Sequence, residues 1–213
     1  ANLGGIMSLR YNHAKNRNEL FLEGGNYGVI DENGNFVIEP LYSYIGSESE
    51  GYRPVCKKDA TFNRYGVIKS DGTLAIDYEY SYARSVVNGM VVVAIGGIWR
   101  SEGFEREKLK VMNNEKNHYL YGAKWGIIDI KGNILFEPFA DFMQVISEGK
   151  VAYRINDKYG VLDLRSKSKQ LTDYDYLSSF HEGRCIVGKF NEYHSLRFGY
   201  IKIPSAMIRD VDT

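Results

Sequence analysis

The sequence predicts an all-β protein built from five tandem units, each made of three antiparallel strands. Three observations support this fold class. A pair formed by an aromatic residue and glycine opens an apolar stretch five times, and a turn residue and usually a second glycine follow at fixed distances. In addition, a composition with 17 Tyr, 22 Gly and only 4 Pro favours short strands and tight turns over helices or disorder.

The first strand of each unit begins at the aromatic-glycine pair. A glycine inside a strand lets a neighbouring backbone or ring come close, and the large ring beside it can fill the space between two units. We therefore expect each aromatic residue to plug the interface with a neighbouring unit. The five pairs are Tyr27-Gly28, Tyr65-Gly66, Trp125-Gly126, Tyr159-Gly160 and Phe198-Gly199.

A hairpin turn and a second strand follow each pair. Six positions after the glycine of the pair, the first three units have another glycine, which readily adopts the positive φ of a tight hairpin. The fourth and fifth units have serine there, and an aspartate recurs beside the turn, which predicts turn hydrogen bonds. The turn residues are Gly34, Gly72, Gly132, Ser166 and Ser205, and the aspartates are Asp31, Asp129 and Asp163.

A third strand follows the second glycine, which stands 23 residues after the first in four units, and residues 6–11 form a similar stretch at the N-terminus. Because three strands cannot bury their own apolar face, the units must stack, either as a propeller-like ring or as an open β-repeat superhelix. The strand order at both ends favours complete blades. We predict one domain, residues 1–213, with units at about 5–40, 51–78, 89–138, 149–172 and 183–211 and an insert at 95–123.

The combined pattern resembles the bacterial WG-repeat family, also called the KWG repeat. The likeness rests on the aromatic-glycine pair, the hairpin glycine, the Glu-Pro step at residues 39–40 and 137–138, and the Glu-Gly step before the third strand. It covers about residues 27–210, although only Trp125 keeps the tryptophan of the family pattern. The resemblance implies a structural building block of diverse bacterial proteins with no common activity.

Charge and motif content argue against several classes of function. Lys and Arg together number 27, as do Asp and Glu, so no positive field attracts nucleic acid or an anionic membrane, and no apolar run is long enough to insert. Cys56 and Cys185 fit small strand residues, and His181 fits a surface turn. We therefore expect no enzyme, catalytic residue, metal or cofactor. The compartment stays open between the cytoplasm and export after signal removal.

The insert is the strongest candidate for a functional segment. It is much longer than the other connections between third and first strands, and its mixed composition suggests a protruding hairpin. Trp99, Arg100 and Phe104 are residue types that anchor protein interfaces, although Trp99 could also fold back on its own unit. We predict that the chain binds another protein as a recognition or scaffold module.

Two other functions remain open from the sequence. An aromatic row could bind a carbohydrate or another cell-envelope ligand by stacking, although its regular placement favours structural plugs. A propeller-type hydrolase with its site in the ring centre rests on analogy between folds alone. The aromatic row consists of Tyr44, Tyr82, Phe142 and Tyr176.

Overall fold

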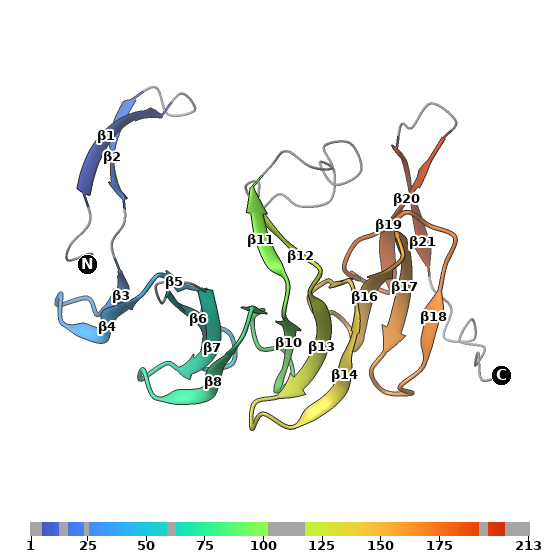
Figure 1. Ribbon diagram of the computed structural model, residues 1–213, viewed down its shortest axis with the longest axis horizontal. Coiled ribbons are helices and arrows are strands. Elements are labelled where there is room, and N and C mark those ends of the chain that lie inside the picture. The colour runs from blue at the N-terminus through green and yellow to red at the C-terminus, as the bar shows by residue number, and fades with distance from the viewer. Residues whose placement is uncertain are drawn as a thin grey trace. The chain divides into compact units, whose positions relative to one another are not determined.

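The computed structural model describes residues 6–12, 17–23, 26–58, 63–101, 118–191 and 196–202, and side chains within 26–57, 63–99, 120–191 and 196–202. All regular secondary structure in these ranges is β-strand, which confirms the all-β class (Figure 1). The chain divides into two compact parts, residues 1–86 and 87–213, and each is described by itself. The single domain of residues 1–213 stays a prediction.

The first part contains three sheets. Two are antiparallel pairs, β1–β2 and β3–β4, and the third has the strand order β5-β6-β7-β8. The short strand β9 (Tyr82–Ala83) follows them in the chain. The other strands are β1 (Ile6–Asn12), β2 (Arg17–Glu23), β3 (Tyr27–Ile30), β4 (Phe36–Tyr42), β5 (Tyr44–Ile45), β6 (Tyr52–Lys58), β7 (Asn63–Lys69) and β8 (Leu74–Tyr80).

The first predicted unit differs from the expected three-strand pattern. The stretch at residues 6–11 does form a strand, β1, but β1 pairs with β2 over its whole length rather than with β3. We did not predict β2, because its sequence carries none of the repeat signals. In the described residues the first unit is therefore the two-stranded sheet β3–β4.

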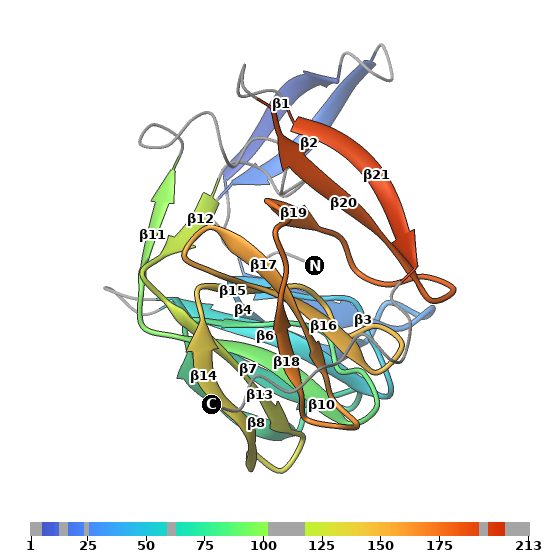
Figure 2. The ribbon, with the colours of Figure 1, turned by 90° about the vertical axis from the view of Figure 1, so that its right-hand side faces the viewer.

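The second part contains a series of sheets and one inserted hairpin. Figure 1 shows the sheets following one another, and Figure 2 shows β20 and β21 as a long twisted pair. The strands are β10 (Met90–Ile95), β11 (Ile98–Ser101), β12 (His118–Tyr121), β13 (Lys124–Asp129), β14 (Ile134–Ala140), β15 (Phe142–Met143), β16 (Lys150–Ile155), β17 (Lys158–Asp163), β18 (Lys169–Leu171), β19 (Tyr176–Leu177), β20 (Arg184–Phe190) and β21 (Leu196–Lys202).

The prediction of three strands per unit is wrong for one sheet in the first part and one in the second, which have four strands each. After β4 and β14 the chain bends at one residue, and the next two residues pair with the third strand of the following unit. The orders are therefore β5-β6-β7-β8 and β15-β16-β17-β18. Two-residue strands carry too little periodicity to be read from a sequence.

The glycine of the aromatic-glycine pair has a clear steric cause in the first three units. Pro138 lies inside β14 rather than at its end, in an irregularity where β14 bulges opposite Gly126. A Cβ atom on Gly126 would stand 2.6 Å from the carbonyl oxygen of Phe136 and 2.9 Å from the nitrogen of Pro138. Gly28 faces the same obstacle from Ile38 and Pro40. In these units the aromatic-glycine pair therefore marks the position opposite a bulge in the second strand.

Successive sheets pack through alternating strand residues. The residue after the glycine of the pair points to the following sheet, as Val29 and Val161 do, and the next residue points to the preceding sheet, as Ile68 and Ile201 do. In the second part, Val161 packs in one cluster with Cys185 of the next sheet. Alternate residues of one strand thus pack against the preceding and the following sheet.

Candidate functional site

The inserted hairpin β11–β12 extends from the second part of the chain. Below it, β10 and β13 pair without a break up to Ile95 and Lys124, so the insert leaves the repeat ladder intact. Gly97 and Gly122 form the junction with positive φ, and a Cβ on Gly97 would lie 2.8 Å from the Cβ of Ala123. Above this junction the register continues from Ile98 opposite Tyr121. Only glycine fits such a close junction in this conformation.

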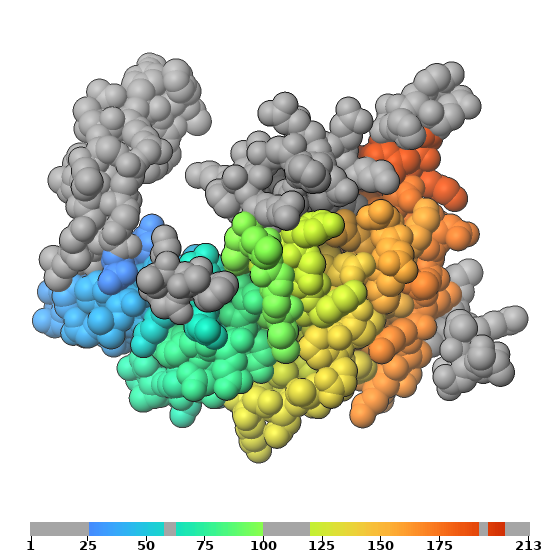
Figure 3. All heavy atoms as spheres, viewed as in Figure 1, coloured from blue at the N-terminus to red at the C-terminus, as the bar shows by residue number. Residues whose placement is uncertain are grey.

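One face of the hairpin has an exposed apolar pair next to the junction. Ile98 and Tyr121 are cross-strand partners, so their side chains lie on the same face, and they are 64% and 57% exposed. Ile95, at the end of β10, is 46% exposed. We call Ile95, Ile98 and Tyr121 the hairpin patch. Figure 3 shows the described atoms of β11, in green, on the surface.

The contact residues predicted from the sequence, Trp99, Arg100 and Phe104, are not part of the hairpin patch. Trp99 lies opposite Leu120 on the other face of the hairpin and is half-buried. Arg100 lies in β11 opposite Tyr119, but its side chain lies outside the described side chains. Phe104 lies outside the described residues altogether. Ile98 and Tyr121 were not singled out from the sequence, although their symmetric placement just inside Gly97 and Gly122 was a usable signal.

The aromatic row packs against the plugs of the aromatic-glycine pairs. The ring centroid of Tyr65 lies 6.0 Å from that of Tyr44 and 5.0 Å from that of Tyr82. In the second part, Trp125 lies 5.5 Å from Phe142, and Tyr176 lies between Tyr159 at 5.8 Å and Phe198 at 6.0 Å. Tyr44 is exposed, and the other three row residues are half-buried. Burial raises the pKa of Tyr176 above its ordinary value.

Two aspartates connect successive sheets of the second part; we call Asp141 and Asp175 the carboxylate clasps. The Nζ atom of Lys158, in β17, lies 2.6 Å from Oδ1 of Asp175, and the backbone N–H of Phe190, in β20, donates to Oδ2 at 2.9 Å. Asp141 is held in the same way by Lys124 at 2.7 Å and by the backbone N–H of Asn156 at 2.9 Å.

Ionisation of the clasps follows from these contacts. Burial opposes ionisation of Asp175, but the bonds from Lys158 and Phe190 outweigh it and hold the pKa of this carboxyl below its usual value. The balance is the same for Asp141, whose pKa is also lowered. Both groups therefore carry a negative charge that is fully paired, which is suited to joining sheets rather than to proton transfer.

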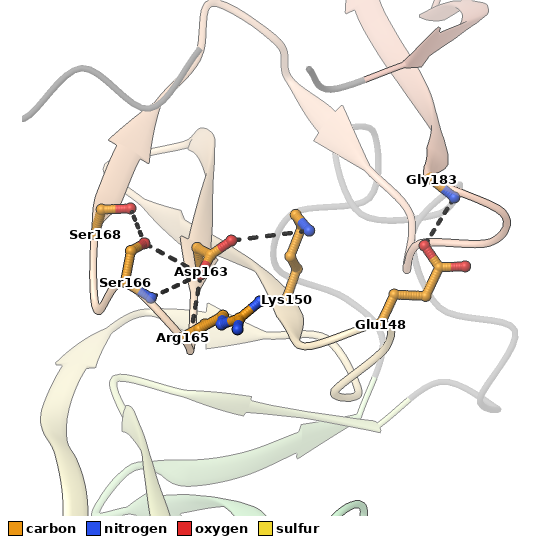
Figure 4. A network of polar contacts seen from close by, with 7 residues as sticks. All are labelled: Glu148, Lys150, Asp163, Arg165, Ser166, Ser168 and Gly183. Carbon is orange, nitrogen blue, oxygen red and sulfur yellow. Dashed lines mark hydrogen bonds and ion pairs between the residues drawn. The ribbon is translucent and has the colours of Figure 1, made fainter. Parts of the chain in front are cut away.

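A second link joins the turns before β16 and β20. Glu148 and Gly149 have φ of 52° and 71°, the positive values of a type I′ turn. The Glu148 carboxylate accepts a hydrogen bond from the backbone N–H of Gly183, 2.8 Å away, in the equivalent turn of the next unit (Figure 4). The hydroxyl of Ser147 donates to the carbonyl oxygen of Phe180 beside it. The recurring Glu-Gly step thus links units here.

The remaining polar groups of Figure 4 are a turn network. The backbone N–H groups of Arg165 and Ser166 donate to Asp163, and Lys150 lies 3.8 Å from the same carboxylate. Burial opposes ionisation of Asp163, yet these bonds lower its pKa. Asp31 and Asp129 accept two backbone N–H bonds each in their own turns, so the turn role predicted for the three aspartates is confirmed.

Other candidate groups were also located. Cys56 and Cys185 are buried and form no disulfide, and burial raises the pKa of Cys185 to about 11. His181 is an exposed turn residue. In the part of the chain that the structure describes, no three His, Cys, Asp or Glu side chains are grouped for a metal ion. A helix long and apolar enough to cross a membrane is likewise not found among the described residues.

Comparison with known proteins identifies the repeat. The family model described as "WG containing repeat" matches residues 27–59, 65–99 and 125–159. Each matched segment begins at the aromatic residue of an aromatic-glycine pair, at Tyr27, Tyr65 and Trp125. No match was found among curated proteins or among solved structures.

Proposed function

Because the chain belongs to the WG-repeat family, we propose that it is a non-enzymatic protein-recognition or scaffold module and that the hairpin patch contacts the partner. The observation that carries this proposal is the opposed, mostly exposed pair Ile98 and Tyr121. Contiguous exposed apolar side chains on a projecting element are typical of protein contact sites. Tyrosine suits such a site because it combines a large apolar ring with a polar tip.

The support beneath the patch favours a preorganised contact. The β10–β13 ladder ends directly below it, and Gly97 and Gly122 fix the direction of the hairpin. Trp99 and Leu120 occupy the opposite face, where the half-buried ring of Trp99 stiffens the hairpin. Less conformational entropy is then lost on binding. Arg100 and Phe104 remain part of the proposed contact, since they continue the same segment.

A capture experiment with a matched control tests this proposal. Three proteins would be immobilised on a resin and incubated with source-organism lysate. They are the intact chain, an Ile98→Ser/Tyr121→Ser variant and an Ile134→Ser/Leu135→Ser variant. Ile134 and Leu135 are comparably exposed, but they lie at the start of β14. We expect the intact chain and the second variant to capture a protein that the first variant does not capture. In calorimetry with that purified protein, the first variant should bind at least tenfold more weakly than the intact chain. Equal binding by both variants would refute the assignment.

The arrangement of the units belongs to the same proposal. The five units stack either as a closed ring or as an open superhelix, and either arrangement would hold the hairpin patch on a rigid support. Small-angle X-ray scattering of the chain in solution distinguishes the two, because an open superhelix has a larger maximum dimension and radius of gyration than a closed ring of the same mass.

A further inference from the structure

The last sheet of the second part has an unusual outer face. Cys185 and Val187 of β20 and Ile201 of β21 point toward the preceding sheet and join its apolar cluster. Strand alternation therefore places their neighbours on the opposite face. The register sets Arg184 opposite Lys202, Ile186 opposite Tyr200 and Gly188 opposite Phe198. We call Arg184, Ile186, Phe198, Tyr200 and Lys202 the outer face of β20–β21.

Two aromatic rings on this face are exposed. Phe198 is 55% exposed, close to the 52% of Tyr27 in the first unit, whereas the plugs Tyr65, Trp125 and Tyr159 are buried. Tyr200 is 77% exposed, whereas the equivalent Val67, Ile127 and Val161 are buried aliphatic residues. At this position the last unit therefore has an exposed tyrosine in place of a buried aliphatic residue.

The two charged residues on the outer face have one sign. Arg184 stands directly opposite Lys202 on this face, whereas Lys189 and Arg197 are paired on the opposite face. The two strands contain these four basic residues and no acidic one. Like charges in cross-strand pairs destabilise a sheet, and a bound anion would remove that repulsion. The balanced charge of the whole chain excludes a long-range field but not such a local site.

We propose that the outer face of β20–β21 binds single-stranded nucleic acid. Phe198 and Tyr200 are two residues apart on one strand, about 6.7 Å, so successive bases can stack on them. Arg184 and Lys202, at the end of the same face, would contact phosphate. An acidic peptide would satisfy the cations but would leave the two exposed rings without planar partners. This inference is independent of the hairpin patch and of the proposed function.

Fluorescence anisotropy with a fluorescein-labelled dodecathymidylate tests the proposal. We expect Tyr200→Val to weaken binding about five- to hundredfold, because one stacked base is lost, and Tyr200→Phe to retain it. Valine already occupies the equivalent positions 67 and 161, so this variant should fold. Two phosphate contacts predict a slope of log K against log salt of about −1.4. Arg184→Gln should halve that slope, and Arg165→Gln, an exposed cation on another turn, should not.

Several results would overturn the assignment. One is absence of oligonucleotide binding at low salt, and another is unchanged affinity of Tyr200→Val with unchanged circular dichroism. Equally strong binding of polyglutamate or polygalacturonate, in competition with the oligonucleotide, would show a general anion site instead. Self-association that Tyr200→Val abolishes, without any oligonucleotide binding, would identify the face as a contact between two copies of the chain.

Discussion

Replacing Asp175 by Asn tests whether the carboxylate clasps hold successive sheets together. The lost ion pair with Lys158, which is half-exposed, is worth roughly 0.2–1 kcal/mol. The bond from the Phe190 N–H changes from charged to neutral, which costs about 1 kcal/mol more. We therefore expect Asp175→Asn to lower the free energy of unfolding by about 1–2 kcal/mol. For a chain of this length the melting temperature should fall by about 3–6 °C.

Urea unfolding at pH 7, followed by circular dichroism, measures this change, and Asp173→Asn is the matched control. Asp173 is exposed and lies two residues away, so its replacement changes the net charge equally without removing a clasp. Because the pKa of Asp175 is lowered on folding, its contribution is full above the unfolded pKa near 3.8 and is lost as the pH falls through the folded pKa. The wild type and Asp175→Asn should converge in acid. Equal destabilisation by Asp173→Asn would refute the clasp.

Three further perturbations have expected outcomes. Glu148→Ala should lower the free energy of unfolding in urea by about 1–2 kcal/mol. Glu148→Gly should lower it by less, because glycine accepts the φ of 52°. The opposite order would contradict the turn geometry. Gly126→Ala should lower the free energy of unfolding by about 3 kcal/mol or prevent folding. Gly132→Ala should lower it by about 1 kcal/mol in thermal melting, because its Cβ would have open space but its φ is positive. Cys185 should resist a thiol reagent at pH 8 until urea unfolds the chain, because burial raises its pKa to about 11; rapid labelling of the native chain would disprove this.

The sequence allowed the repeat to be predicted because its signals have local physical causes. Gly34, Gly72 and Gly132 all have φ of 86°, as the hairpin spacing predicted. In the first three units the glycine of the pair is required by a bulge that lies at the same distance along the chain. Such constraints recur with a fixed period and can be read without an alignment.

The missing features depend on contacts between residues that no local pattern connects. Glu148 was recognised as part of a Glu-Gly step, but its partner Gly183 lies 35 residues away in another turn. Asp175 contacts Lys158 and Phe190 from two different sheets. Ile98 and Tyr121 become neighbours only after the insert folds back on itself. These parts of the candidate site could be located only when the register of the strands was known.

The junction of the inserted hairpin allows the insert to change in length without changing the sheet below it. Its two ends leave the ladder at Ile95 and Lys124, which are already cross-strand partners. A longer or shorter segment between them therefore moves no residue of β10 or β13. This position is a natural graft point, where a foreign peptide can be displayed, and where sequence change during evolution leaves the underlying sheet undisturbed.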